Sequence, residues 1–183
     1  MSDARRRAAD HADGPQRDPQ PTIALATEAD AAAISAVRRA AAADLTARFG
    51  DGHWTGAASE RGVLSEMKTA QLWLARRGAE TVGTFSLSTR KPWAIDRSYF
   101  TDARRPLYLT GMAVHPAAQR RGVGRLCLER AASIARAWPA DAVRLDAYDA
   151  DAGAGAFYER CGFRCVARVV YREAPLAYYE LML

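Results

Sequence analysis

Alternating and helical runs of apolar residues divide the first part of the chain into recognisable elements. Thr22–Ala26 alternates as a first strand, and Thr27–Asp30 then has the form of a helix-capping box. Apolar residues recur at helical spacing from Ile34 to Phe49, and Gly50 ends this predicted helix. A shorter helix is predicted from Ser59 to Met67.

A hairpin and a long insert follow these helices. Gln71–Arg77 and Thr81–Arg90 alternate as two antiparallel strands that turn at Gly78. Lys91–Pro106 is an irregular insert, and loops of this length are more often functional than not. Two interpretations of this insert stay open: a wall or lid of a binding pocket, or a segment that packs on the core.

The strand that begins at Leu107 contains a break in its alternation. Its apolar positions are Leu107, Leu109, Met112 and Val114, so the phase slips at Thr110-Gly111. One extra residue shifts the side chains to the other face, and the slip therefore predicts a β-bulge. His115-Pro116 ends the strand because proline cannot continue the ladder.

A glycine-containing loop, Gln119–Gly124, leads from this strand into a helix that extends to Trp138. The predicted inner stripe of that helix is Val123, Cys127, Ala131, Ile134 and Trp138, with Leu126 and Leu128 beside it. The first turn of a helix has unpaired N–H groups and the positive end of the macrodipole, and glycines let a phosphate approach the backbone. The sequence therefore predicts an anion site at this loop.

The remaining segments complete one domain over residues 22–183. Val143–Tyr148 alternates as a strand, Gly153–Cys161 is a short helix, and Phe163–Tyr171 pairs with Ala177–Leu183 as a final hairpin. Met1–Pro21 is polar and proline-containing, and we expect a disordered tail there.

Composition narrows the classes of function. The 183 residues suit a single domain, and no apolar run approaches the length of a membrane span. The formal net charge of +5 suits an anionic cofactor, and no basic helix with interleaved aromatics indicates nucleic-acid binding. Three cysteines without metal-ligand spacing indicate free thiols in a reducing cytoplasm and no metal site. Arginine- and alanine-rich usage indicates a GC-rich genome, and we expect a bacterial protein. The oligomeric state stays open, with a homodimer as one option.

Two motifs in order give a specific resemblance. Gln119-x-x-Gly122-x-Gly124 after the strand end Met112–Pro116 resembles the acetyl-CoA signature of the GCN5-related N-acetyltransferase (GNAT) superfamily. Asp151-x-x-Ala154, followed by Tyr158 and then Gly162-Phe163, resembles that superfamily's second conserved segment. The resemblance implies an α/β (α+β) domain with a mixed, mostly antiparallel sheet of about six to seven strands. It also implies about four flanking helices and splayed central strands.

The same resemblance implies acetyl-CoA as co-substrate and assigns residues to it. Backbone groups at the bulge would polarise the acetyl carbonyl, and the glycine loop would hold the pyrophosphate. The implied cofactor-binding residues are Met112, Ala113, Val114, Gln119, Arg120, Arg121, Gly122, Val123, Gly124, Arg125, Asp151 and Ala154. Asp151 stands where many relatives have Asn, so one hydrogen-bond donor is lost there.

Tyr158 is the implied catalytic residue, as the proton donor to the departing thiolate. The alternative is that Tyr158 packs with Phe157 between helix and sheet. Some members of the superfamily have a Glu base on the central strand, where this chain has Tyr108. Asp146 or a water relay could take the proton, and no base is assigned. His53, Trp54, Tyr108 and Asp146 are the candidate contacts to the acceptor.

The predicted function is acetyl transfer from acetyl-CoA to an amine of a small molecule or peptide, by direct attack in a ternary complex. Two alternatives remain. One is a non-catalytic acyl-CoA sensor, which would need the same backbone site without turnover. The other is transfer to a hydroxyl, or of a longer acyl group, since fold does not define the acceptor.

Overall fold

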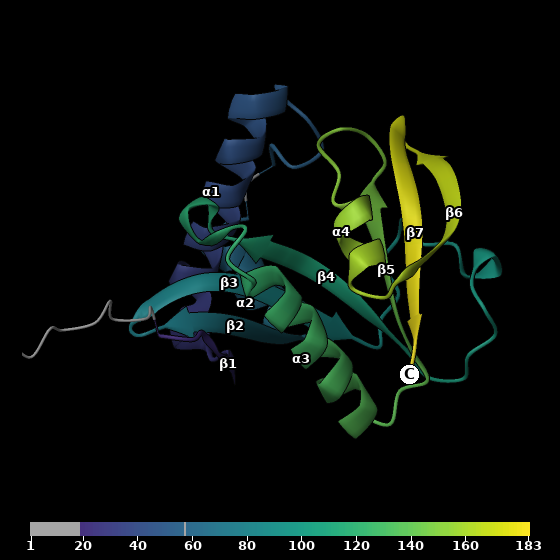
Figure 1. Ribbon diagram of the computed structural model, residues 1–183, viewed down its shortest axis with the longest axis horizontal. Helices are drawn as coiled ribbons and strands as arrows, with labels where there is room; N and C mark the ends of the chain where they lie inside the picture. Colours follow the sequence, from purple (N-terminus) through teal and green to yellow (C-terminus); the bar gives the residue numbers. More distant parts are fainter. Residues whose placement is uncertain (1–18, 57) are drawn as a thin grey trace, which may run out of the picture.

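The computed structural model describes residues 19–56 and 58–183, and the predicted tail over residues 1–21 lies outside them except for its last three. The described chain forms one seven-stranded sheet in the order β1-β2-β3-β4-β5-β7-β6 (Figure 1). The strands are β1 (Thr22–Leu25), β2 (Gln71–Arg77), β3 (Glu80–Ser88), β4 (Pro106–Val114), β5 (Ala142–Tyr148), β6 (Arg164–Tyr171) and β7 (Ala174–Met182). The α-helices are α1 (Ala31–Phe49), α2 (Glu60–Met67), α3 (Val123–Ala137) and α4 (Gly155–Arg160).

This architecture confirms the predicted fold class, and the predicted element bounds agree with the observed ones to within three residues. Three short 3-10 helices complete the described elements: η1 (Glu28–Asp30), η2 (Arg97–Tyr99) and η3 (Pro116–Ala118). The capping box predicted at Thr27 is present and opens η1, which runs directly into α1. Among residues 19–56 and 58–183, no helix has both the length and the apolar character needed to cross a bilayer.

The two central strands diverge, as the resemblance implies. β4 and β5 form the one parallel pair of the sheet, and their register covers only Pro106↔Ala142, Leu107↔Val143 and Tyr108↔Arg144. Beyond Tyr108, β4 continues for six residues that have no partner on β5. Backbone groups along this edge are therefore available to another ligand.

The predicted bulge is also present. Thr84 pairs with Ala113 and Ser86 with Thr110, so Gly111 and Met112 together oppose Phe85. Gly111 has φ +57°, which favours glycine. A Cβ there would lie 2.2 Å from Nη2 of Arg38, so the guanidinium of α1 occupies the space of a side chain.

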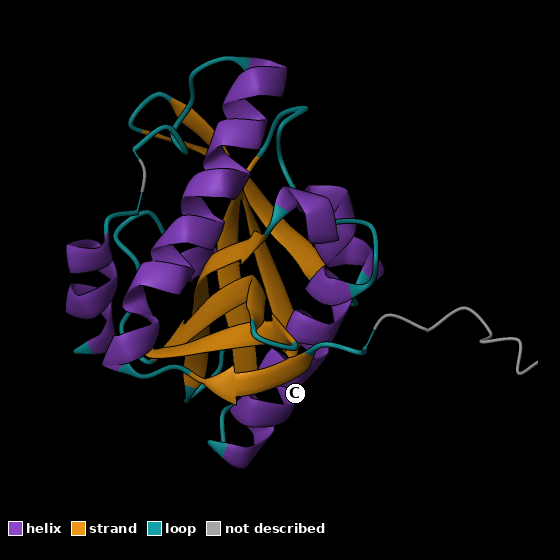
Figure 2. Ribbon diagram, turned by 90° about the vertical axis from the view of Figure 1, so that its left-hand side faces the viewer, coloured by secondary structure: helices purple, strands orange, loops and turns teal. Residues whose placement is uncertain are grey.

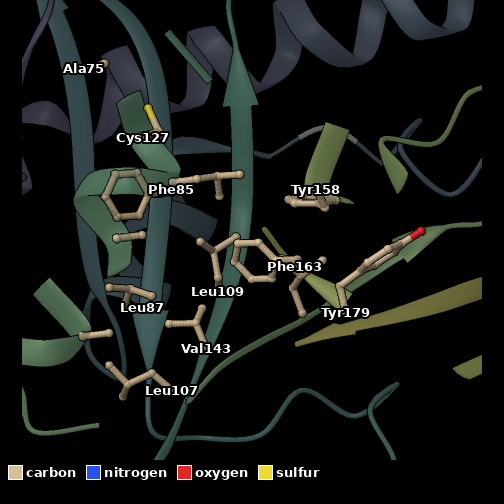
Figure 3. Packing of buried hydrophobic residues seen from close by; sticks show 14 of the residues in the cluster. Ala75, Phe85, Leu87, Leu107, Leu109, Cys127, Val143, Tyr158, Phe163 and Tyr179 are labelled. Carbon is tan, nitrogen blue, oxygen red and sulfur yellow. The ribbon is translucent and has the colours of Figure 1, made fainter. Parts of the chain in front are cut away.

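Helices cover both faces of the sheet (Figure 2). Helices α1 and α2 pack on one face through a buried cluster of Ala31, Ile34, Val63, Leu72 and Leu74. Helices α3 and α4 cover the opposite face, where Cys127 and Tyr158 approach Phe85, Leu109 and Phe163 (Figure 3).

The insert between β3 and β4 packs on the core. Ile95 and Phe100 are buried in a cluster with Tyr108 and Tyr178. Beneath it, Arg144 Nε donates to Glu180 Oε1 at 3.0 Å, and each side chain is at most 2% exposed. The Arg144 guanidinium also donates to the carbonyl of Thr101 and lies 4.8 Å over the Phe100 ring. The core-packing interpretation of this insert therefore holds for these residues, and the lid interpretation has no support from them.

We expect Glu180→Gln to lower the free energy of unfolding by about 3–5 kcal/mol, because it leaves the buried Arg144 charge without its counter-ion. Urea unfolding of both proteins measures this difference. Arg164→Gln is the matched control, since Arg164 also approaches Glu180 at 3.5 Å but is 67% exposed, and an exposed pair contributes about 0–1 kcal/mol. Equal losses in the two variants would contradict the prediction.

Candidate functional site

A groove of about 620 Å³ lies between the end of β4, the start of α3 and α4. The residues predicted from sequence that line it are Met112, Ala113, Val114, Gln119, Arg120, Gly122, Gly124, Arg125, Ala154 and Tyr158. Phe157, Arg160 and Cys161 line it too. Sequence reasoning missed these three, although they flank Tyr158 in the second motif and α4 presents them to the same space.

Three predicted cofactor residues do not line this groove. Val123 is 1% exposed and belongs to the core, so only its backbone could serve a ligand. Arg121 is exposed, and Asp151 is exposed in the loop between β5 and α4. The assignment of these side chains to a cofactor stays a prediction without geometric support.

The loop before α3 has a conformation that suits an anion. Arg120 has φ +58° and Gly122 has φ +80°, and α3 starts after Gly122 without a side-chain cap. The Gln119 side chain donates to the Val114 carbonyl at 3.2 Å, which fixes the loop against the end of β4. The first N–H groups of α3 and its positive dipole end therefore point to this part of the groove.

The charge of the lining agrees with an anionic ligand. Arg120, Arg125 and Arg160 line the groove, and no Asp or Glu is among its described lining residues. Phosphate groups are bound by such a combination of guanidinium and helix N-terminus.

Space at Gly124 is tight on the groove side. A Cβ at this position would lie 3.0 Å from Cζ of Phe157 and 3.7 Å from Cε of Met112. Glycine thus lets the Phe157 ring close against α3 while the backbone of α3 stays open to the groove.

Tyr158 lines the groove from α4. Its ring is 7% exposed and contacts Phe157, Phe163 and Tyr179 at centroid distances of 5.5, 5.9 and 5.6 Å. Within the described part of the chain, no residue accepts or donates a hydrogen bond to the Tyr158 hydroxyl. Burial, and secondly the Asp146 carboxylate, raises the pKa of Tyr158, so the phenol stays protonated at neutral pH.

The thiol of Cys161 lies in the same groove but is not an activated nucleophile. Burial raises its pKa, and this effect exceeds the opposing effect of the Arg125 charge. Thiolates are the nucleophilic form, and a raised pKa keeps the thiol neutral.

The predicted acceptor contacts divide into two groups. His53 and Trp54 lie in the loop after α1, where both rings contact Tyr148 at the end of β5. Asp146 precedes Tyr148 by two residues and interacts electrostatically with His53. Tyr108 is 2% exposed and packs in the core with Tyr178, so the prediction that it contacts the acceptor has no geometric support.

Among residues 19–56 and 58–183, no group of three or more His, Cys, Asp or Glu side chains gathers at a point where a metal ion could bind.

Comparisons with known proteins agree with this geometry. The model of the acetyltransferase (GNAT) family matches residues 39–163, and no curated protein matches the chain. A ribosomal-protein-alanine N-acetyltransferase from Brucella melitensis superposes with a TM-score of 0.69 at 18% identity, over 88% of this chain and 99% of that one. A putative acetyltransferase from Salmonella typhimurium with its cofactor acetyl-CoA gives 0.64 at 22% identity, over 90% and 94%.

An N-acetyltransferase from Staphylococcus aureus Mu50 gives a TM-score of 0.65 at 16% identity, over 88% of this chain and 98% of that one. At such identities these structures establish a shared fold and leave the acceptor open. The family match spans the bulge, the glycine loop, α3 and α4, which together form the groove. The chain belongs to the acetyltransferase (GNAT) family.

Proposed function

We propose that this protein transfers an acetyl group from acetyl-CoA to an amine. The observation that carries the proposal is the groove beside the open edge of β4, which the Tyr158 side chain lines together with three arginines. Arg120, Arg125 and the N-terminus of α3 belong to the same groove and suit the phosphates of acetyl-CoA.

Acetyl-CoA supplies an activated acetyl group as a thioester. The backbone at Met112, Ala113 and Val114 would orient it along the open edge of β4, where N–H groups can stabilise charge on the acetyl oxygen. Overall, the amine nitrogen bonds to the acetyl carbon, the carbon–sulfur bond breaks, and sulfur ends with one proton. An acceptor that starts as an ammonium ion therefore releases one proton to solvent.

Tyr158 would donate the proton to sulfur. Its raised pKa makes it a weak acid, but burial also disfavours a thiolate in the same groove. Burial disfavours both the phenolate and the thiolate in this groove. The phenol would therefore transfer its proton to sulfur as the carbon–sulfur bond breaks, and the phenolate would take up a proton that the attacking nitrogen loses. We place the reaction in the cytoplasm, where the free thiols of Cys127, Cys161 and Cys165 stay reduced.

Release of free CoA thiol with a panel of amines, together with mass detection of the product, tests this function. The panel contains alkylamines, arylamines, an alanine-terminated peptide and matched alcohols, each with acetyl-CoA and butyryl-CoA. We expect amine-dependent release with acetyl-CoA. Binding of acetyl-CoA without release for any acceptor would instead favour a sensor, and release with alcohols alone would favour O-acetyl transfer.

A further inference from the structure

A second hollow, of about 370 Å³, lies where the insert between β3 and β4 leads into the start of β4. Four cationic residues of the insert line it, namely Lys91, Arg97, Arg104 and Arg105, and we call it the basic hollow. No Asp or Glu is among its described lining residues. The insert therefore gathers positive charge at this point in addition to packing on the core.

The basic hollow is separate from the groove that suits acetyl-CoA. β4 lines the basic hollow with Leu107 and Tyr108, and it lines the groove with the residues from Met112 to Val114. Helix α3 begins beside the groove and ends at Trp138, which lines the basic hollow (Figure 1). The 15 residues of α3 span about 22 Å at 1.5 Å per residue. A ligand in the basic hollow is therefore distinct from a phosphate bound at the start of α3.

The backbone of the insert is fixed around the basic hollow. Lys91 Nζ donates to the carbonyl of Ile95 at 2.6 Å, and Ile95 is 2% exposed in the core. At the other end of the insert, Asp141 Oδ2 accepts the backbone N–H groups of Arg104 at 3.1 Å and of Arg105 at 3.0 Å. The chain positions that carry the cations thus follow from the fold.

Two of the four cations have an acidic neighbour outside the lining. Arg105 Nη2 lies 3.3 Å from Asp141 Oδ1, in an exposed ion pair. Lys91 interacts electrostatically with Asp96. These two carboxylates offset part of the positive charge, so the excess charge of the basic hollow comes from the other two cations.

Arg97 and Arg104 have no acidic partner. Among residues 19–56 and 58–183, no carboxylate forms an ion pair with either guanidinium. The end of α3 offsets little of this charge, because the Ala135 carbonyl accepts the N–H groups of Trp138 and Ala140 and the helix dipole amounts to a partial charge. Two guanidinium groups in one hollow can bind a phosphate through charge-assisted hydrogen bonds.

The basic hollow also has an apolar part. Pro106, Leu107, Trp138 and Ala140 line it beside the cations. Leu107 is 2% exposed and belongs to the core, and Trp138 is half-buried against the same core. Sites for small molecules combine an apolar lining with a few charged groups in volumes of about 300–1,000 Å³. The basic hollow has both features and a volume at the lower end of this range.

We propose that the basic hollow binds a small organic phosphate. Its phosphate group pairs with Arg97 and Arg104, and its organic part lies against Trp138 and Leu107. A phosphate monoester has a charge of about −1.5 to −2 at pH 7 and supplies the counter-ion that the two arginines lack. This site does not take part in the proposed acetyl transfer.

Calorimetry with phenyl phosphate, inorganic phosphate and phenol tests the class of ligand. Phenyl phosphate has both the charge and the apolar ring, whereas each of the other probes has only one of them. We expect phenyl phosphate to bind more tightly than either, with an affinity that falls as salt increases. Equal affinity for inorganic phosphate or for phenol, or no binding of phenyl phosphate, would overturn the proposal.

Two double variants test the role of the arginines. Arg97→Gln/Arg104→Gln should lower the affinity for phenyl phosphate by about tenfold or more, because it removes both unpaired guanidinium groups. Arg39→Gln/Arg61→Gln is the matched control, since it removes the same charge from exposed positions in α1 and α2. This control should bind phenyl phosphate like the parent. Equal affinities of the two double variants would contradict the assignment.

Amide NMR of the parent protein locates the bound probe, because the arginines of the acetyl-CoA groove also attract phosphate. We expect phenyl phosphate to shift the amide signals of Leu107 and Ala140 and to leave those of Gly122 and Gly124 unchanged. The affinity for phenyl phosphate should also persist in Gly124→Glu. Shifts confined to Gly122 and Gly124 would place the probe in the groove and overturn the proposal. These outcomes are independent of acetyl transfer, which release of the CoA thiol measures separately.

Discussion

Tyr158→Phe should lower kcat for amine acetylation by about 10²–10⁴-fold, which is the usual contribution of a positioned general acid. The substitution removes only the hydroxyl and keeps the ring, whose contacts with Phe157, Phe163 and Tyr179 hold α4 on the sheet. The hydroxyl has no hydrogen-bond partner within the described residues, so its removal leaves no protein group unsatisfied. Acetyl-CoA affinity and the melting temperature should therefore change little.

Steady-state kinetics with a fixed amine, together with acetyl-CoA calorimetry, measures these effects. Tyr179→Phe is a matched control, because Tyr179 contacts the Tyr158 ring but does not line the groove. Loss of kcat in Tyr158→Phe alone would support proton donation. An unchanged kcat would leave Tyr158 as a packing residue, and the thiolate would then depart unaided.

The sequence predicted the parts of this site that depend on local rules. Side chains of a strand alternate between its two faces. The change of phase of the apolar residues at Thr110-Gly111 therefore predicted one extra residue, and the bulge lies at this point. Gly122 indicated where α3 starts. The apolar residues Val123, Cys127 and Ala131 indicated which side of the helix faces the sheet, and all three are buried.

The parts that depend on tertiary contacts could not be predicted in this way. Arg144 alternates with apolar neighbours along β5, and it is only 2% exposed because the insert covers that face of the strand. In α3, Leu128, Ala132 and Ala135 are buried while Ile134 and Trp138 are only partly so, because the helix presents a broader face to the sheet than one stripe. The contact of His53 with Tyr148 depends on how the loop after α1 folds, which periodicity does not report.

Gly124→Glu should abolish measurable acetyl-CoA binding while the fold is retained. The added carboxylate would lie in the groove where Arg120, Arg125 and the N-terminus of α3 attract phosphate. Two unit charges about 4 Å apart repel by about 4 kcal/mol at an effective dielectric constant near 20, which corresponds to about a thousandfold loss of affinity. The stability of α3 should not decrease in this variant, because glutamate is favourable in the first turn of a helix and glycine is a poor helix former.

Two further variants separate the effect of the added charge from the effect of the added side-chain volume. Calorimetry with acetyl-CoA at low and high salt compares the affinities of all three variants. Gly124→Ala adds only the Cβ, which meets Phe157 Cζ at 3.0 Å, so its loss of affinity should be smaller and independent of salt. Gly56→Glu adds the same charge at an open position, where nothing lies within 4 Å of a Cβ, and it should bind like the parent. Repulsion between exposed charges weakens as salt increases, so part of the affinity of Gly124→Glu should return at high ionic strength. A folded Gly124→Glu protein with parental affinity would remove the start of α3 from the cofactor site.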